Sequence, residues 1–324
     1  MLNDVSLEIL QKCLNNCIHC SSNSCFESKA ILEFKVIKEI IDDIVCLGAK
    51  RLCLSGGEPF LHPDITNIVE YATRKGLILD IYSSGIMGDN NQTVSLDEMM
   101  LINCKKAGLN RIMFNVQAAS SEVYDAVMMT AGNFGKLVES IKRTEACGIE
   151  TEIHFVPMKQ NYDEIESVVK LAEELNVESV SFLRLVPHGR AEQYKDKIML
   201  NDQELEVVQN KLYKMKAAGK KIRIGLPLTY PSEEANCHAV KEKLYIKFDG
   251  SVFGCEAFKY IQFHGINGEK IGPDNVLENR ICQVHKNSLF LKKSLELVER
   301  YSGDIADCGN CPVQKFLKGE NKDV

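Results

Sequence analysis

The stretch VSLEILQKCLNNCIHC, residues 5–20, joins an apolar run to three closely spaced cysteines. Residues 5–10 are mostly apolar, as a strand buried in a parallel sheet requires. Cys13, Cys17 and Cys20 follow this run directly. In barrels of alternating strands and helices, the loops after the carboxyl ends of the strands carry the active site. We therefore predict a first strand over residues 5–10 and a metal or redox site in the loop that follows it.

Beyond this stretch, short apolar runs alternate with amphipathic segments, which is typical of repeated βα units around a parallel sheet. Crossovers between parallel strands are nearly always right-handed, so six consecutive units curl into a partial barrel. We expect an α/β fold with a partial (β/α)6 barrel over residues 1–225, since a full eight-stranded barrel would need a longer chain. The predicted strands are 5–10, 51–54, 78–82, 111–116, 150–156 and 178–185.

Amphipathic segments predict the helices between these strands. Apolar residues over 36–45 share one helical face, and Gly48 stands where a helix ends. Ser95 with Glu98 forms a capping-box pattern that predicts the start of the third helix. Further helices are expected near 133–147, 162–175 and 202–219.

The pattern changes after about residue 225. Asp249 and Gly250 lie between two short apolar runs, 244–248 and 251–253, and an Asp-Gly pair in this setting is a strong hairpin signal. We expect a small second domain over residues 226–324, built from a β-hairpin plus helix and bearing several cysteines.

Composition narrows the possible functions. The chain has 324 residues, 45% of them apolar and 26% charged, which indicates a globular protein. A net charge of -6 makes nucleic acid an unlikely partner. Neither a membrane helix nor a signal peptide is evident, so we expect a cytoplasmic protein. Thirteen cysteines in a reducing compartment indicate metal or redox chemistry.

The first cysteine set contains three thiols, and thiolates bind either zinc or iron–sulfur clusters. Three thiolates leave a four-coordinate site without its fourth ligand. On spacing alone, a zinc ion completed by His19 or Cys25 remains an alternative to an iron cluster with one open iron.

A second set lies in the predicted C-terminal domain, where four thiolates would form a complete tetrahedral set for zinc or a [4Fe–4S] cluster. Its members are Cys237, Cys255, Cys308 and Cys311. By spacing alone, zinc is the more common occupant. We interpret Cys282 as a structural thiol, with a reactive donor as the alternative, and Cys25 stays unassigned.

Four more cysteines occur within predicted strands or on apolar helix faces. We interpret these as buried small apolar residues rather than ligands. They are Cys46, Cys53, Cys104 and Cys147.

The segment Ser55-Gly56-Gly57-Glu58-Pro59 follows the second predicted strand. Together with the three-cysteine loop, it resembles the radical SAM superfamily. The resemblance implies that Cys13, Cys17 and Cys20 hold a [4Fe–4S] cluster whose open iron chelates S-adenosylmethionine. It also implies that the Gly56, Gly57, Glu58 and Pro59 segment contacts the methionine amino group, and a carboxylate suits an ammonium.

Other positions match the family pattern by their place after predicted strands. His19 takes the position of an aromatic residue that packs near the adenine. Residues expected to contact the cosubstrate at the same mouth are Ser83, Ser84, Asn115, Gln117 and Arg184. The run 187–190 also follows the sixth predicted strand and is expected to face this mouth. Serine-glycine and proline-glycine runs are also ordinary turn chemistry, which is the alternative reading of these segments.

The second cysteine set resembles the twitch domain, a shortened SPASM domain. This implies an auxiliary [4Fe–4S] cluster without an open iron, held by all four cysteines. A molybdopterin-pathway cyclase would instead have three auxiliary cysteines and a C-terminal Gly-Gly pair, and neither is present.

The implied reaction is reductive cleavage of S-adenosylmethionine to a 5′-deoxyadenosyl radical, which abstracts a substrate hydrogen atom. We expect a ribosomally made peptide substrate that is cross-linked, given a thioether or epimerised, and an electron donor of flavodoxin or ferredoxin type. Only 12 residues precede the first cluster, which leaves no room for an N-terminal peptide-recognition domain. One alternative is therefore a dehydrogenase of sugar-like or cyclitol-like alcohols; another is a non-catalytic iron–sulfur or zinc protein.

Overall fold

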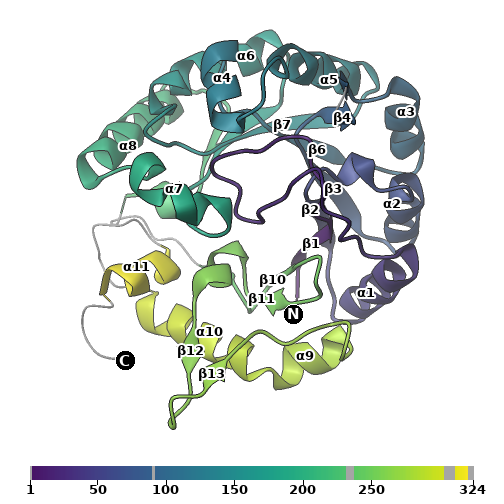
Figure 1. The fold of residues 1–324 in the computed structure, drawn as a ribbon, viewed down its shortest axis with the longest axis vertical. Helices are drawn as coiled ribbons and strands as arrows, with labels where there is room; N and C mark the ends of the chain where they lie inside the picture. The colour runs from purple at the N-terminus through teal and green to yellow at the C-terminus, as the bar shows by residue number, and fades with distance from the viewer. Residues whose placement is uncertain (1, 90–91, 231–236, 303–310, 320–324) are drawn as a thin grey trace.

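The computed structural model describes residues 2–89, 92–230, 237–302 and 311–319. Within these ranges the core is a curved parallel sheet with helices outside it (Figure 1). No helix in the described ranges is long and apolar enough to cross a membrane.

The main sheet has nine strands in the order β11-β10-β1-β2-β3-β6-β7-β8-β9. Every neighbouring pair is parallel except β10 with β11. Its strands are β1 (Asp4–Leu10), β2 (Arg51–Gly56), β3 (Ile78–Ser83), β6 (Arg111–Asn115), β7 (Glu150–Phe155), β8 (Ser179–Phe182), β9 (Ile222–Ile224), β10 (Lys243–Ile246) and β11 (Val252–Phe253). The predicted partial barrel is therefore confirmed, with all six predicted strands present.

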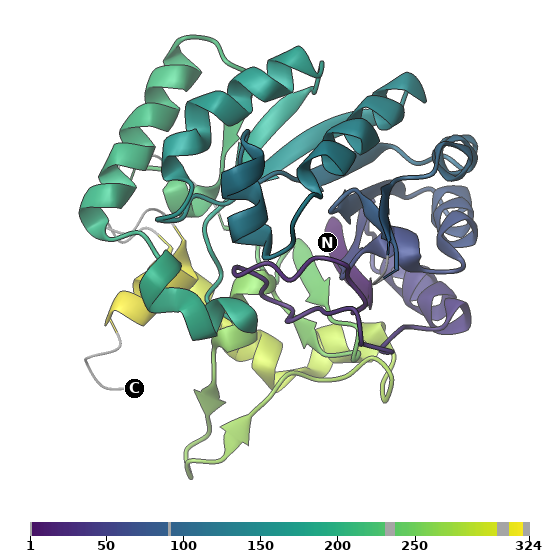
Figure 2. The same cartoon turned by 45° about the horizontal axis from the view of Figure 1, so that its top comes forward.

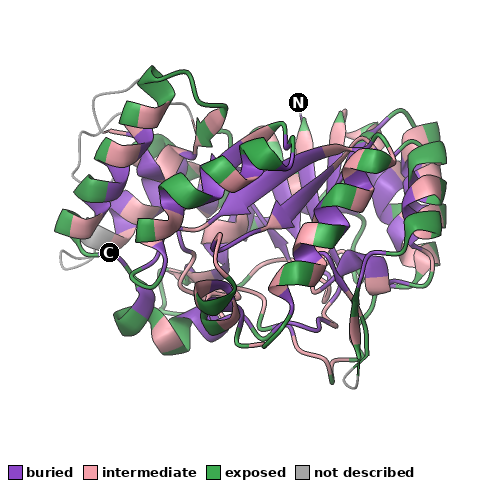
Figure 3. Cartoon of the chain, turned by 90° about the horizontal axis from the view of Figure 1, so that it is seen from above, coloured by how far each residue is buried: buried purple, intermediate pink, exposed green. Residues whose placement is uncertain are grey.

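The helices alternate with these strands and bury one face each, as Figure 3 shows by the contrast between their inner and outer sides. They are α1 (Phe34–Cys46), α2 (Ile65–Arg74), α3 (Glu98–Lys106), α4 (Ser121–Met128), α5 (Phe134–Ala146), α6 (Ile165–Glu174), α7 (Arg190–Ile198) and α8 (Asp202–Ala217). Helix α1 buries Ile37, Ile40, Ile41 and Ile44. Gly48 follows its C-cap with φ of 91°, a conformation that glycine adopts without strain. Helices α4 and α7 were not predicted.

Two strands enlarge the sheet beyond the prediction. Strand β9 extends it beside β8, and β10 pairs with β1 through Asp4↔Lys243 to Leu7↔Ile246. The predicted hairpin forms, with Ile246 opposite Val252, but its first strand continues the barrel sheet. Eight parallel strands thus fit in this chain, since the sheet stays open and does not close into a barrel.

Two local predictions are wrong. Ser95 does not cap the third helix, because it ends β5 (Thr93–Ser95), which pairs with β4 (Ile86–Gly88). Asp97 is the N-cap instead, and its side chain accepts a hydrogen bond from the Met100 amide at 2.8 Å. Cys46 ends α1 with its side chain exposed rather than buried.

The remaining C-terminal elements lie below and to the left of β10 and β11 in Figure 1. They are η4 (Glu256–Tyr260), β12 (Phe263–His264), β13 (Lys270–Ile271), α9 (Ile281–Asn287), α10 (Leu289–Tyr301) and α11 (Pro312–Gly319). Phe290 makes edge contacts with Phe253 and Phe263, at centroid distances of 5.6 and 5.2 Å. The Arg280 side chain binds the Asp43 carboxylate, which attaches α9 to α1.

Candidate active site

The loop after β1 runs across the carboxyl end of the sheet (Figure 2). Its backbone is fixed on two sides: the amide of Cys13 donates to the carbonyl of Cys25 at 3.1 Å, and that of Ile18 donates to Val127 at 3.0 Å. Cys13 and Cys17 are buried, whereas Cys20 is half-buried. The predicted loop therefore reaches the predicted edge of the sheet and is held there by α4.

The three thiols of this loop are near one another in a buried environment. Burial and the neighbouring Glu58 raise the pKa of Cys13 to about 12. Burial and the other two cysteines also raise the pKa of Cys17, whereas Arg190 lowers it. Three thiolates this close repel one another unless a cation offsets their charge, so the set suits a metal or a cationic cluster.

The chemistry of the donor set fits an iron–sulfur cluster. All described cysteines are free thiols. Cys25 touches the loop through its backbone, which pairs with Lys12.

The Gly-Gly-Glu segment at the end of β2 packs directly against the start of this loop. The amides of Gly57 and Glu58 donate to the carbonyls of Leu10 and Lys12, each at 2.8 Å. A Cβ on Gly56 would lie 2.2 Å from the Leu10 oxygen, and one on Gly57 would lie 2.0 Å from the Lys12 oxygen. The glycines are thus required for close approach between two segments of the chain itself.

The carboxylate of Glu58 is fully buried and joins β2 to the end of β3. It accepts hydrogen bonds from the Ser83 hydroxyl at 2.9 Å, from the amide and hydroxyl of Ser84 at 2.7 and 2.6 Å, and from the Phe60 amide at 3.2 Å. Burial raises its pKa despite these bonds. Residues predicted separately from two motifs therefore meet, and much of the hydrogen-bonding capacity of Glu58 is used within the protein.

His19 and the predicted polar pair lie at the end of β6. The side chain of Asn115 interacts with His19 and accepts a hydrogen bond from Gln117 at 2.5 Å. Burial lowers the pKa of His19 to about 4, so its ring is neutral near pH 7. Gln117 is fully buried and also accepts from the Val156 amide at 3.1 Å. Its role in this structure is to connect β6 with the chain after β7.

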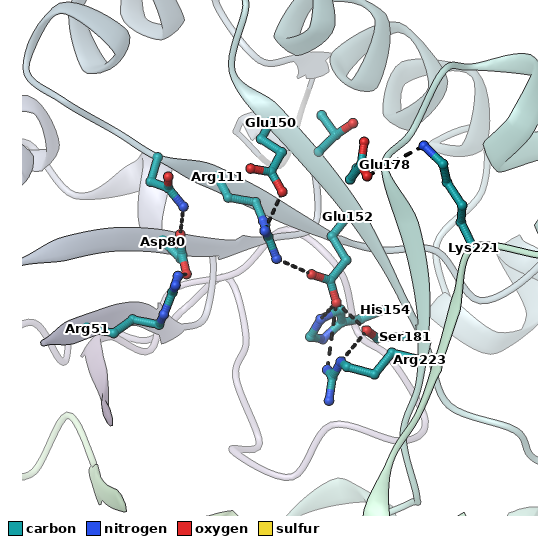
Figure 4. A network of polar contacts seen from close by, with 12 residues as sticks. Arg51, Asp80, Arg111, Glu150, Glu152, His154, Glu178, Ser181, Lys221 and Arg223 are labelled. Atoms are coloured by element: carbon teal, nitrogen blue, oxygen red, sulfur yellow. Dashed lines mark hydrogen bonds and ion pairs between the residues drawn. The ribbon is translucent and has the colours of Figure 1, made fainter. Parts of the chain in front are cut away.

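A network of polar side chains connects neighbouring strands of the main sheet and was not predicted from the sequence (Figure 4). Glu152 of β7 accepts from Arg111 at 2.6 Å and from His154 Nε2 at 3.0 Å, and it also binds Ser181. Burial lowers the pKa of His154, and its Nδ1 has no hydrogen-bond partner among the described groups. The signal for this network is the alternation of polar residues within strands 111–115 and 150–155, which places them on one face.

The second cysteine set is partly described. The half-buried Cys255 interacts electrostatically with Cys311 and Cys237, so the fold brings three of the four predicted ligands near one another. Cys308 lies outside the described residues. Tyr260 of η4 interacts with Cys311, Cys255 and Arg184.

Arg184 lies on this second side rather than beside Glu58. It lines a cavity formed by the chain after β8, η4 and α11, and Tyr260, Gln314 and Leu317 form the opposite wall. Glu58 with Ser83 and Ser84 lies against the start of the loop after β1, and Asn115 contacts His19 within that loop. The predicted contacts therefore fall into two groups at the mouth of the sheet.

The sequence model of the Radical SAM superfamily matches residues 7–172, about half of the chain. The chain belongs to the radical SAM superfamily. It is accordingly an enzyme of the class that uses S-adenosylmethionine and a [4Fe–4S] cluster.

Curated relatives carry different activities. An AdoMet-dependent heme synthase of Methanosarcina barkeri is 27% identical over 190 residues, which are 58% of this chain and 52% of the relative. A PqqA peptide cyclase of Ruegeria pomeroyi is 26% identical over 185 residues, covering 57% of this chain and 47% of the relative. The chain thus spans about half the length of these relatives.

Solved structures share the fold. Streptococcus suis SuiB bound to S-adenosylmethionine superposes with a TM-score of 0.73 at 16% identity, covering 98% of this chain and 74% of SuiB. The protein anSMEcpe with bound AdoMet gives 0.67 at 13% identity, covering 98% of this chain and 94% of its own. At these identities the likeness establishes the fold alone.

Proposed function

We propose that Cys13, Cys17 and Cys20 hold a [4Fe–4S] cluster that cleaves S-adenosylmethionine and that the resulting radical removes a hydrogen atom from a peptide. One observation carries this proposal. The cysteine loop, the Gly-Gly-Glu segment and the serines after β3 form one hydrogen-bonded layer at the carboxyl edge of the sheet. Active sites of parallel barrels lie at this edge.

When bound, the cluster supplies the electron that converts S-adenosylmethionine to methionine and a 5′-deoxyadenosyl radical. The protein contributes position and exclusion of water, which protect a reactive intermediate. Glu58 fixes the backbone of the layer through Ser83 and Ser84, and its carboxylate would contribute the negative charge that pairs with the methionine ammonium. The neutral ring of His19, next to Asn115, supplies an apolar face for the adenine.

We also propose that Cys237, Cys255, Cys308 and Cys311 hold an auxiliary [4Fe–4S] cluster. The proximity of Cys255 to Cys237 and Cys311 supports this set. With both clusters, anaerobically reconstituted protein should contain about eight iron and eight sulfide per chain. Stoichiometric zinc with negligible iron would contradict both assignments.

Three comparisons support a peptide substrate. SuiB has been solved with its precursor peptide SuiA, anSMEcpe with a Cp18Cys peptide, and a PqqA peptide cyclase is among the relatives. A second candidate is a small molecule, because a heme synthase is 27% identical over 190 residues. We also propose a cytoplasmic location, where thiols stay reduced. The proposed electron donor is a flavodoxin or ferredoxin, because the proposed cluster must accept one electron for each cleavage of S-adenosylmethionine.

A fractionated extract of the source cells separates the two substrate classes. The low-molecular-mass fraction is added to reconstituted, reduced enzyme with S-adenosylmethionine, and 5′-deoxyadenosine is measured. A peptide substrate predicts stimulation that disappears when the fraction is first treated with protease and the protease is removed. Stimulation that survives this treatment would contradict the peptide proposal and favour the small molecule.

A further inference from the structure

Arg190 lies under the cysteine loop and contacts it at several points. Its Nη1 donates to the carbonyl of Cys17 at 3.0 Å and its Nη2 to that of Ser24 at 2.7 Å, while its backbone amide donates to Cys20 at 2.9 Å. The residue is 8% exposed. One buried guanidinium therefore bridges the backbone of the loop at Cys17 and at Ser24.

The preceding residue is shaped for the same contact. Gly189 has φ of 62°, and a Cβ there would lie 2.7 Å from the Ser21 oxygen and 2.9 Å from the Cys20 oxygen. Any side chain at this position would push α7 away from the loop. The start of α7 is thus fitted to the backbone around Cys20.

A second buried cation reaches the same loop from the other side. Lys259 Nζ lies 3.2 Å from the Glu8 carboxylate and 3.1 Å from the Ser22 hydroxyl, and both ion-pair side chains are 1% exposed. The charge of Lys259 is therefore offset by Glu8. In contrast, no described carboxylate forms an ion pair with Arg190, whose charge acts on the Cys13 and Cys17 thiols.

We propose that Arg190 is a positioning residue for the radical-generating cluster: it holds the loop in its ligating shape, and its unpaired charge makes that cluster easier to reduce. This inference rests on the proposed ligand set Cys13, Cys17 and Cys20. Reduction adds one negative charge to the cluster, and a buried positive charge stabilises that product strongly where the dielectric constant is low. Net charge and hydrogen bonds around a cluster are known determinants of its potential.

The test compares three variants of the full chain after anaerobic reconstitution. Arg190→Gln removes the positive charge but keeps a hydrogen-bond donor. Arg190→Lys keeps the charge but cannot donate to the Cys17 and Ser24 carbonyls at once. Glu8→Gln with Lys259→Met removes an ion pair whose net charge is zero. The reduction potential of the signal that responds to S-adenosylmethionine is measured by EPR-monitored titration. The Cys13→Ala, Cys17→Ala, Cys20→Ala variant identifies that signal by losing it.

We expect Arg190→Gln to lower the equilibrium constant for one-electron reduction on the order of tenfold, which is about 59 mV toward more negative potential. Arg190→Lys should stay closer to the wild type, and the double variant should not shift the potential. An unshifted potential in Arg190→Gln, or an equal shift in the double variant, would overturn the proposal. A signal that persists in the triple cysteine variant would instead overturn the ligand assignment.

Hydrogen exchange on the metal-free proteins tests the loop contact separately and does not require the cluster. Arg190→Gln should expose the amides of residues 17–24 to faster exchange, while the sheet keeps its protection. Arg190→Gln could lose its iron, in which case hydrogen exchange decides. Exchange at the wild-type rate would overturn the proposal. Faster exchange in Arg190→Gln, together with an intact cluster of unchanged potential in Arg190→Lys, would support it.

Discussion

The loop with Cys13, Cys17 and Cys20 is a single segment hydrogen-bonded to the chain after β2, to α4 and to α7. In contrast, Cys237, Cys255 and Cys311 lie before β10, after β11 and before α11. The first set can therefore adopt its shape once the barrel has folded. The second depends on β10, β11 and α11 being docked together. On the proposed assignments, radical generation belongs to the barrel, and the proposed auxiliary cluster depends on the docking of the C-terminal elements.

Removing the first set should have the largest effect. The variant Cys13→Ala, Cys17→Ala, Cys20→Ala should lose about half of its iron and all reductive formation of 5′-deoxyadenosine, because its open iron is gone. Cys46→Ala is the matched control, since that thiol is exposed and ends α1. Continued 5′-deoxyadenosine formation by the triple variant would place the chemistry elsewhere.

Removing the second set should have a smaller effect on cleavage. Cys255→Ala with Cys311→Ala should lose the auxiliary cluster and the substrate product but retain uncoupled 5′-deoxyadenosine formation. Circular dichroism checks that the barrel remains folded, because metal loss can unfold small metal-built segments. A folded double variant that still makes normal product would show that the second cluster is dispensable.

Glu58→Gln should weaken the layer that joins the two motifs. Its amide group cannot accept all the hydrogen bonds from Ser83, Ser84 and Phe60, so we expect the free energy of unfolding to fall by about 1–3 kcal/mol. Binding of S-adenosylmethionine should weaken as well. Urea unfolding and calorimetry measure these effects, with the exposed Glu27→Gln as control. Unchanged stability would mean that the buried hydrogen bonds of Glu58 contribute little.

The smallest effect concerns His154 in the polar network. Burial lowers its pKa in the folded state, so below about pH 6.5 the unfolded chain binds a proton that the folded chain does not. Protonation of His154 in the unfolded chain favours unfolding, so the free energy of unfolding is unaffected above about pH 6.5 and decreases as the pH falls below it. His154→Gln should therefore reduce the slope of unfolding free energy below pH 6.5 by up to about 1.4 kcal/mol per pH unit. An identical slope in urea unfolding would reject the buried neutral histidine.

Much of the barrel was predictable from sequence because apolar strands and amphipathic helices repeat through residues 5–182. The meeting of Glu58 with Ser83 and Ser84 was predictable only in outline. Position after consecutive strands puts these residues at one edge, but their mutual hydrogen bonds depend on side-chain direction. The short runs of β9 and β10 were missed as barrel strands because pairing at a sheet edge is set by tertiary contacts.

The contacts of Arg190 and the exposure of Cys46 could not be predicted from the sequence. The sequence predicts that residues 187–190 face the mouth of the barrel, with a simple turn as the alternative. Nothing local shows that the Arg190 guanidinium contacts a loop more than 160 positions earlier. Cys46 falls next to the apolar stripe of α1, but the helix ends there and leaves it exposed. Both cases depend on which elements become neighbours in space.

The most direct test of the account is the EPR spectrum of the Cys255→Ala, Cys311→Ala variant, reconstituted and reduced, with and without S-adenosylmethionine. Only the first cluster remains in this protein, so its spectrum isolates the proposed open iron. The account predicts a single reduced four-iron signal that changes when S-adenosylmethionine is added and disappears when Cys13, Cys17 and Cys20 are also replaced. A signal that does not respond to S-adenosylmethionine, or one that survives the loss of those three cysteines, would contradict it.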